Sequence, residues 1–298
     1  MQTPTRIAAF AVGLAAVFAA SVGVGAAVGP VDAEPATGAH TAEPHTDGAH
    51  GATTGGDPTT DVAVGGLAVS ESGYTLDLTA DTLPAGPGIP LSFRILGPDG
   101  APVTAVEVEH DEDLHLVAVR RDLTGYQHVH PTLAPDGTWT APLDLTPGSW
   151  RVVADLAPAG LGEGLTLGAD LAVPGGFTPQ PLPPPSVTAE VDGYTVVLTG
   201  GLTAGEEARV QLSVSRDGVP VTDLQPHLGA FGHLVVLRQG DLGYVHVHPV
   251  PEVPGAAPAP GPHVVFGATA PSPGTYRLFL DFRHGDAVRT AEFTVEVP

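Results

Sequence analysis

The chain of 298 residues is 42% hydrophobic, so it is long enough and apolar enough for two domains with buried cores. With 33 acidic residues against 11 basic ones and a formal net charge of −22, it lacks the basic patch that a nucleic-acid-binding protein needs. It has no cysteine, and its single methionine is Met1, so any metal site would use nitrogen and oxygen ligands.

Residues 1–33 are predicted to be an export segment. An uncharged run over residues 7–28 follows Arg6, and as a helix it is long enough to cross a bilayer. The same run, with the Val-Asp-Ala sequence at residues 31–33, also fits a cleaved signal peptide. The segment is therefore either a membrane anchor or a signal peptide. In both cases the rest of the chain lies outside the cytoplasm, secreted or anchored to the outer face of the cytoplasmic membrane.

Residues 34–60 are rich in Gly, Thr, Ala and Pro, a composition that predicts a disordered linker. This linker carries His40, His45 and His50 at a regular spacing. Two interpretations remain open for these histidines: a loose tail that collects metal ions, or chance in a polar linker.

An internal repeat defines the rest of the chain. The stretch HLVAVRRDLTGYQHVHP at residues 115–131 recurs as HLVVLRQGDLGYVHVHP at residues 233–249. We therefore expect two copies of one domain, at residues 61–174 and 187–298. The Pro-rich segment 175–186 between them is predicted to be an extended, fairly stiff linker.

Each copy consists of short runs of alternating apolar and polar residues between Gly and Pro turns, and no helical period follows the export segment. About seven such strands per domain indicate an immunoglobulin-like fold. The predicted fold class is therefore all-β, with two tandem immunoglobulin-like (Greek-key) β-sandwich domains after an N-terminal apolar helix. The sequence leaves the oligomeric state open.

Three histidines recur at the same spacing in each repeat. His128 and His130 are two apart on a predicted strand, so both side chains point to one face and can converge on one ion. His115 stands 13 residues before His128, in the preceding strand. The second repeat has the same arrangement with His233, His246 and His248.

The hairpin between these strands decides whether the three histidines meet. A two-residue loop would place Val119 opposite His128 and Val117 opposite His130. His115 then lies on the same face as both, because it shares parity with the two valines. In the second repeat the matching pairs are Leu237 with His246 and Val235 with His248.

Further ligands are expected close to each histidine group. His110 and His227 lie just before the first histidine of each group, and Asp155 and Asp281 end a later strand. Imidazole and carboxylate ligands suit Zn(II) and Cu(II), so these residues predict a site for one of these two metals. The alternative is that the histidines are buried residues that only brace the hairpin by hydrogen bonds.

The motif in residues 233–249, followed by PGTYRLFLDF, resembles a group of exported bacterial domains. Their signature is H-L-V-V-x-x-x-D-L-x-x-y-x-H-x-H-P with a later G-x-Y-x-x-x-x-D-F, and they often occur beside copper or heavy-metal handling modules. The resemblance covers the hairpin and the later strand of each repeat. It implies that the shared site positions are His115, His128, His130 and Asp155 in the first copy and His233, His246, His248 and Asp281 in the second.

The second repeat matches this pattern more fully, because the first has Ala154-Asp155-Leu156 where the second has Leu280-Asp281-Phe282. We therefore expect the better metal site in the second repeat, with His246 and His248 at its centre.

The predicted function is an extracytoplasmic metal-binding protein that sequesters or buffers Cu(II) or Zn(II). The alternative is a non-catalytic, cell-surface immunoglobulin-like structural or interaction protein with structural histidines. We expect no enzyme. The HVH strand is similar to that of Cu,Zn superoxide dismutase, but the chain lacks the cysteines and the histidine-rich loop of that family. The expected partners are the metal ion and, if the first segment is not cleaved, the membrane.

Overall fold

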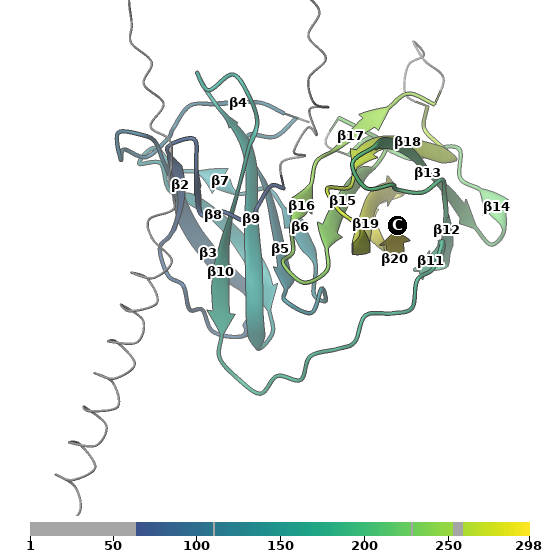
Figure 1. Ribbon diagram of the computed structural model, residues 1–298, viewed down its shortest axis with the longest axis horizontal. Helices are drawn as coiled ribbons and strands as arrows, with labels where there is room; N and C mark the ends of the chain where they lie inside the picture. Colours follow the sequence, from purple (N-terminus) through teal and green to yellow (C-terminus); the bar gives the residue numbers. More distant parts are fainter. Residues whose placement is uncertain (1–63, 110, 228, 253–258) are drawn as a thin grey trace, which may run out of the picture. The chain divides into compact units, whose positions relative to one another are not determined.

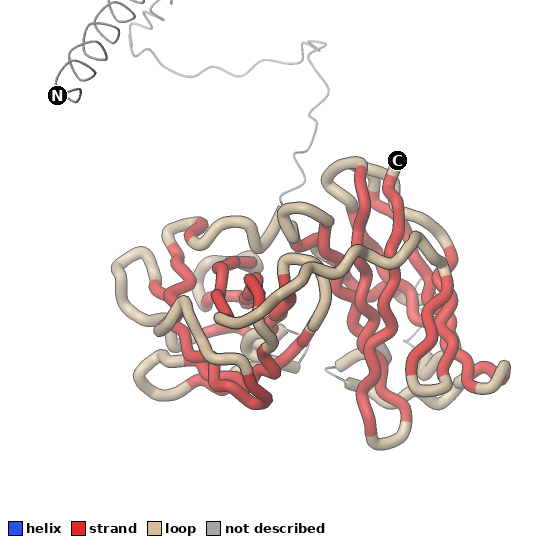
Figure 2. Tube along the Cα trace, turned by 90° about the horizontal axis from the view of Figure 1, so that it is seen from below, coloured by secondary structure: helices blue, strands red, loops and turns tan. Residues whose placement is uncertain are grey.

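The computed structural model describes residues 64–109, 111–227, 229–252 and 259–298. Every regular element in these ranges is a β-strand (Figure 2), which confirms the all-β prediction. The described ranges hold no helix that is long and apolar enough to span a membrane. The predicted apolar helix, the histidine-containing linker and His110 all lie outside the described residues.

The first repeat contains ten strands in two sheets (Figure 1). One sheet has the order β1-β2-β3-β8-β7, and the other has the order β10-β9-β5-β6, with β4 paired to β9. The strands are β1 (Ser70–Glu71), β2 (Tyr74–Leu78), β3 (Gly86–Leu96), β4 (Val106–Glu107), β5 (His115–Arg120), β6 (Gln127–Val129), β7 (Thr132–Leu133), β8 (Trp139–Leu145), β9 (Gly148–Pro158) and β10 (Leu165–Val173).

The second repeat has the same two-sheet plan. One sheet has the order β11-β12-β13-β18-β17, with β14 paired to β13, and the other has the order β16-β15-β19-β20. The strands are β11 (Thr188–Val191), β12 (Tyr194–Thr199), β13 (Glu207–Arg216), β14 (Val219–Pro220), β15 (His233–Arg238), β16 (Tyr244–Val245), β17 (Val247–Val250), β18 (His263–Thr269), β19 (Gly274–His284) and β20 (Ala287–Val297).

The division of strands between sheets is that of an immunoglobulin-like Greek-key sandwich. In the first repeat, β2, β3, β7 and β8 belong to one sheet while β5, β6, β9 and β10 belong to the other, so the chain crosses between sheets after β3, before β7 and again before β9. The second repeat divides β12, β13 and β18 from β15, β19 and β20 in the same way. The predicted fold class is confirmed for both repeats.

Burial alternates along β8, as expected for a strand with one face in the core and the other in solvent. Along β8, buried residues from Trp139 to Leu145 alternate strictly with exposed ones, so one face packs in the core and the other meets solvent. In contrast, β5, β9, β15 and β19 are buried on both faces. A second layer must therefore cover the outer face of each of these sheets.

That layer is the other repeat. A third apolar cluster, here named the inter-repeat cluster, joins side chains of both copies, and the two repeats belong to one compact unit, Pro58–Pro298. Burial of one Val, Leu or Phe side chain in this cluster stabilises the folded protein by roughly 1.5–3 kcal/mol. The inter-repeat cluster consists of Val117, Val119, Leu123 and Val153 from the first repeat and Val235, Leu237, Leu242 and Phe279 from the second.

The predicted hairpin register is wrong by two residues in both repeats. Val117, not Val119, lies opposite His128, and Leu237 lies opposite Tyr244. The loop is longer than two residues because Leu123 and Leu242 adopt the left-handed conformation, at φ 61° and 63°, and are buried in the inter-repeat cluster. A shift of two residues keeps the parity of a strand, so the predicted common face of the histidines survives.

The segment that enters the first repeat bridges the two sandwiches. Gly65 and Tyr244 exchange backbone hydrogen bonds at 3.1 and 2.9 Å, and the Gly66 amide donates to the Thr166 carbonyl at 2.9 Å. This path runs so close to β10 that a Cβ on Gly168 would lie 2.0 Å from the Gly66 carbonyl oxygen. Only glycine fits at position 168.

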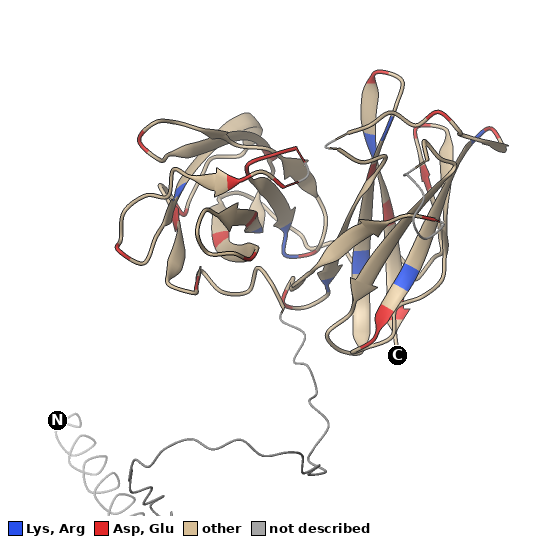
Figure 3. Ribbon diagram, turned by 90° about the horizontal axis from the view of Figure 1, so that it is seen from above, with Lys and Arg blue, Asp and Glu red and all other residues tan. Residues whose placement is uncertain are grey.

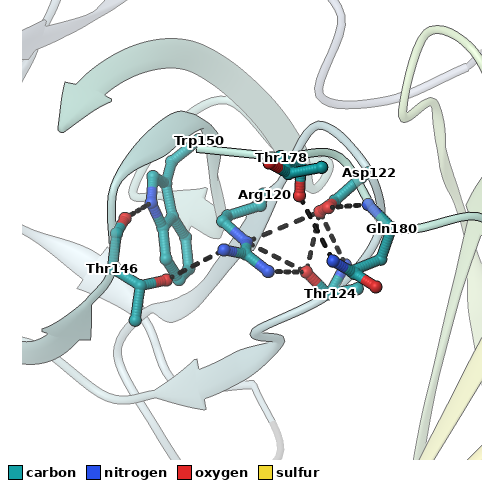
Figure 4. Close-up of polar contacts among 7 residues, drawn as sticks. All are labelled: Arg120, Asp122, Thr124, Thr146, Trp150, Thr178 and Gln180. Carbon is teal, nitrogen blue, oxygen red and sulfur yellow. Dashed lines mark hydrogen bonds and ion pairs between the residues drawn. The ribbon is translucent and has the colours of Figure 1, made fainter. Parts of the chain in front are cut away.

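The linker 175–186 is held against the first repeat (Figure 4). The Gln180 amide donates to Asp122 at 3.0 Å. The Arg120 guanidinium lies over the Phe177 ring. Asp122 also accepts a hydrogen bond from the Thr124 hydroxyl at 2.7 Å, so one carboxylate closes the hairpin and holds the linker.

The hairpins of the two repeats provide a matched pair for testing this contact. Asp241 occupies the position of Asp122 in the second hairpin, where it accepts from Arg238 and Gly243. We expect Asp122→Ala to lower the free energy of unfolding by about 1 kcal/mol more than Asp241→Ala, because only Asp122 holds the linker. Urea unfolding measures the difference, and limited proteolysis should cut linker 175–186 faster in the Asp122 variant. Equal cleavage in the two variants would contradict this assignment.

Candidate metal centre

Three histidines of the first repeat form a compact group, here named the histidine triad: His115, His128 and His130. One ring nitrogen of each lies within 4.8 Å of the others. His115 begins β5, and the His130 ring lies 5.1 Å from the His115 ring, between ring centroids. The prediction that these three residues share a face is confirmed.

The second repeat adds two histidines to the same place. The His233 ring lies 6.1 Å, between ring centroids, from the rings of His115 and His128. The His227 ring lies 6.4 Å from that of His130. Five imidazoles from both repeats therefore lie around one point, whereas the sequence predicted a separate group in each repeat.

Hydrogen bonds to outer groups fix the direction of two triad rings. His115 Nε2 donates to the Glu109 carbonyl oxygen at 3.2 Å, and His128 Nδ1 donates to Asp281 Oδ2 at 3.1 Å. With a carbonyl oxygen and a carboxylate oxygen as acceptors, the hydrogens of the two rings lie on these outer nitrogens. The inner nitrogens, His115 Nδ1 and His128 Nε2, then face each other as lone-pair donors at 3.1 Å.

The third triad ring also presents a nitrogen inward. His130 Nε2 is buried and has no hydrogen-bond partner among the described residues. Its other nitrogen, Nδ1, lies 4.0 Å from Glu112 Oε1. A buried polar nitrogen without a partner costs about 1–3 kcal/mol, which a bound ion would remove.

The two aspartates are exchanged between the repeats relative to the sequence-based grouping. Asp281 accepts hydrogen bonds from His128 and, at 3.2 Å, from the Tyr126 hydroxyl, both of the first repeat. Asp155 accepts from Thr166 at 2.7 Å and from Tyr244 of the second repeat. The assignment of Asp155 to the first group and Asp281 to the second is corrected accordingly, because each carboxylate reaches across the interface.

The histidines His246 and His248 of the second repeat are more exposed to solvent than the triad, although the sequence predicted the better site in the second repeat. His246 is exposed and lies between β16 and β17, outside both strands. His248 lies in β17 opposite Gly267, 3.5 Å from Glu207, with 45% of its side chain exposed. The compact triad therefore belongs to the first repeat.

Burial favours the neutral form of His115, His130 and His227. Burial, followed by repulsion from His128, lowers the pKa of His115 to about 3. The same two causes lower the pKa of His130 to about 4. Burial also lowers the pKa of His227. Neutral imidazole is the form that binds a metal, so these rings are ready for coordination at neutral pH.

Two tyrosines that the sequence analysis did not single out support the centre. Burial and the nearby Asp281 raise the pKa of Tyr126 well above its usual value, and burial and Asp155 do the same for Tyr244. Both hydroxyls therefore stay protonated and act as donors. The signal was present in the repeat, because each tyrosine stands two residues before the first histidine of an HVH pair.

Residues 68–161 and 189–298 match the family described as Domain of unknown function (DUF8832), one segment in each repeat. The chain belongs to the DUF8832 family. The two DUF8832 segments contain every site residue discussed above, including both exchanged aspartates. A comparison with curated proteins gives no match.

Several solved structures are similar to the DUF8832 chain at low identity. The Escherichia coli adhesin FdeC is 17% identical with a TM-score of 0.26, covering 78% of this chain and 66% of that one. The Yersinia pseudotuberculosis adhesin InvE is 14% identical with a TM-score of 0.23, covering 76% and 59%. The fibronectin(III)-like modules of Clostridium thermocellum CbhA are 12% identical with a TM-score of 0.21, covering 75% and 93%. The chain thus spans less than two thirds of the FdeC and InvE chains.

The depressed histidine pKa values predict a loss of stability in acid. Below the unfolded-state pKa of 6.5, the unfolded chain binds a proton at His115 that the folded protein does not accept until its pKa of about 3. Stability is therefore complete above pH 6.5 and falls as the pH is lowered. For metal-free protein we expect His115 alone to cost roughly 2 kcal/mol at about pH 5.

Urea unfolding of the metal-free protein at neutral and acidic pH measures this loss. The variant His115→Gln is expected to show a shallower fall between the two pH values, whatever its stability at neutral pH. An unchanged slope in that variant would contradict a buried, neutral His115.

Proposed function

We propose that this DUF8832 protein is a non-catalytic, extracytoplasmic immunoglobulin-like tandem that binds Zn(II) or Cu(II) at the interface of its repeats. The histidine triad supplies the ligands, with His233 and His227 of the second repeat beside it. Sequestration or buffering of the metal is the role that such a site supports, because the donor set offers binding without a redox-active sulfur ligand.

The facing nitrogens of His115 and His128 carry this proposal. Two lone pairs at 3.1 Å repel each other unless a cation or a proton lies between them. A proton on His115 is disfavoured at neutral pH, because burial lowers the pKa of this residue to about 3. A metal ion accepts both lone pairs at once. Nitrogens bound to one tetrahedral Zn(II) are about 3.4 Å apart, which is close to the observed separation.

The surroundings of the triad support a cation in two further ways. The contact of His128 with Asp281 is the carboxylate–histidine arrangement that orients metal ligands in many zinc proteins. In addition, acidic positions outnumber basic ones across the described ribbon (Figure 3), so the field of the protein attracts cations.

The hydrogen bonds that Asp281 accepts from Tyr126 and His128 also favour a second candidate function. The chain from Tyr126 through Asp281 to His128 connects the repeats without any ion. The histidines would then brace a surface module, as in an immunoglobulin-like structural or interaction protein. Metal counting separates the two candidates.

Replacing His128 and His130 together with Ala should remove one bound ion per chain. The full-length protein is loaded with Zn(II), separated from unbound metal by gel filtration and analysed for zinc per chain. The double variant His263→Ala, His284→Ala is the matched control, because these two histidines bond to Ser213 and Asp223 far along the chain from the triad. Equal zinc in the wild-type protein and the triad variant would leave only the structural role.

Asp281→Asn should weaken Zn(II) binding about 10- to 100-fold without removing a ligand, because the ring of His128 loses its charged acceptor. Competition titration with a zinc-binding dye measures the affinity. The conservative variant Asp281→Glu should recover part of it. An unchanged affinity in Asp281→Asn would show that Asp281 does not position His128.

A further inference from the structure

The strands around the triad have counterparts in the second repeat. His115 lies opposite Asp155 across β5 and β9, and His233 lies opposite Asp281 across β15 and β19. His233 Nε2 donates to the His227 carbonyl oxygen at 2.9 Å, as His115 donates to that of Glu109. The other ring nitrogen of His233 is Nδ1, as it is in His115.

The surroundings of the two aspartates are matched except at one residue. Thr290 donates to Asp281 at 2.5 Å and Tyr126 donates to it, while Thr166 and Tyr244 do the same for Asp155. The third partner of Asp281 is His128. Its counterpart, His246, is exposed instead of buried.

A cavity connects His246 with these groups. It has a volume of about 330 Å³ and carries no Arg or Lys among its described lining residues. Its lining holds carboxylates and imidazoles from both repeats: Glu71, Glu109, Asp155, His115, His128, His233 and His246.

We propose that this cavity takes a second divalent metal ion, bound by His233 and His246, with Asp155 as the positioning residue for His246. The proposal rests on the proposed function, since it adds an ion beside the one at the triad. Water or a small anion completes the coordination in the remaining space.

The geometry requires only a local change. His246 lies outside the strands, between Val245 and Val247, so its ring can turn toward Asp155 without breaking a ladder pair. There, Asp155 would accept the Nδ1–H of His246 as Asp281 accepts that of His128. The carboxylates in the lining offset the charge of a second cation, and no Arg or Lys among the described lining residues opposes it.

The experiment compares three full-length proteins: wild type, His246→Ala and the triad variant His128→Ala, His130→Ala. Each is loaded with Zn(II) and its zinc per chain is measured after gel filtration. We expect each variant to hold one ion fewer than the wild type. Since His246 is exposed, His246→Ala should leave the melting temperature of the metal-free protein unchanged.

Loading with Cu(II) gives an independent measurement. Two Cu(II) ions in neighbouring sites couple magnetically, so the wild type should show a half-field signal in electron paramagnetic resonance that either variant lacks. Asp155→Asn should weaken the second ion about 10- to 100-fold while the first is unaffected.

If His246→Ala holds as much zinc as the wild type while the triad variant holds less, the second site is wrong and the triad site stands. If the triad variant also holds as much as the wild type, the proposed function itself is wrong.

Discussion

The inter-repeat cluster is the contact on which the histidine centre depends. The faces of β5, β9, β15 and β19 that would meet solvent in a single sandwich carry Val, Leu and Phe, and they are covered by each other. This packing brings the start of β5 beside the start of β15, and so His115 beside His233. It also removes water from the rings, which lowers their pKa values and exposes their lone pairs to any ion that enters. The arrangement and burial of the histidines thus depend on the packing of the inter-repeat cluster.

The exchanged aspartates make the centre a property of the tandem. His128 belongs to the first repeat, but the carboxylate that orients it belongs to the second. Tyr126 of the first repeat also contacts the second repeat. Its ring stacks on Phe279, with ring centroids 4.0 Å apart, and its hydroxyl donates a hydrogen bond to Asp281. A single repeat would lack the carboxylate that accepts the hydrogen bond from His128. This contact therefore requires both copies of the domain.

The sequence was sufficient for the repeat, the fold class and the common face of the triad, because strand periodicity and Gly/Pro turns are local signals. The hairpin register was wrong by two residues. Leu123 and Leu242 look like ordinary turn neighbours in the sequence, and their left-handed conformation is stabilised by burial against the other repeat. The partners of Asp155 and Asp281 were assigned to the wrong repeat for the same reason. Both errors arise from contacts between residues that are far apart in the chain, which no local pattern encodes.

The difference between the two halves of the centre follows from where the chain leaves the sheet. In the first repeat, β6 stays paired with β5 through Val129, so His128 is held inside. In the second repeat, pairing with β15 ends at Val245, and β17 joins β18 of the other sheet from Val247 onward. His246 is the residue at the crossing and so has no ladder partner to fix its ring. The repeat whose motif matches the exported-domain pattern more fully is therefore the one whose histidine is exposed, and sequence similarity alone does not rank the two halves.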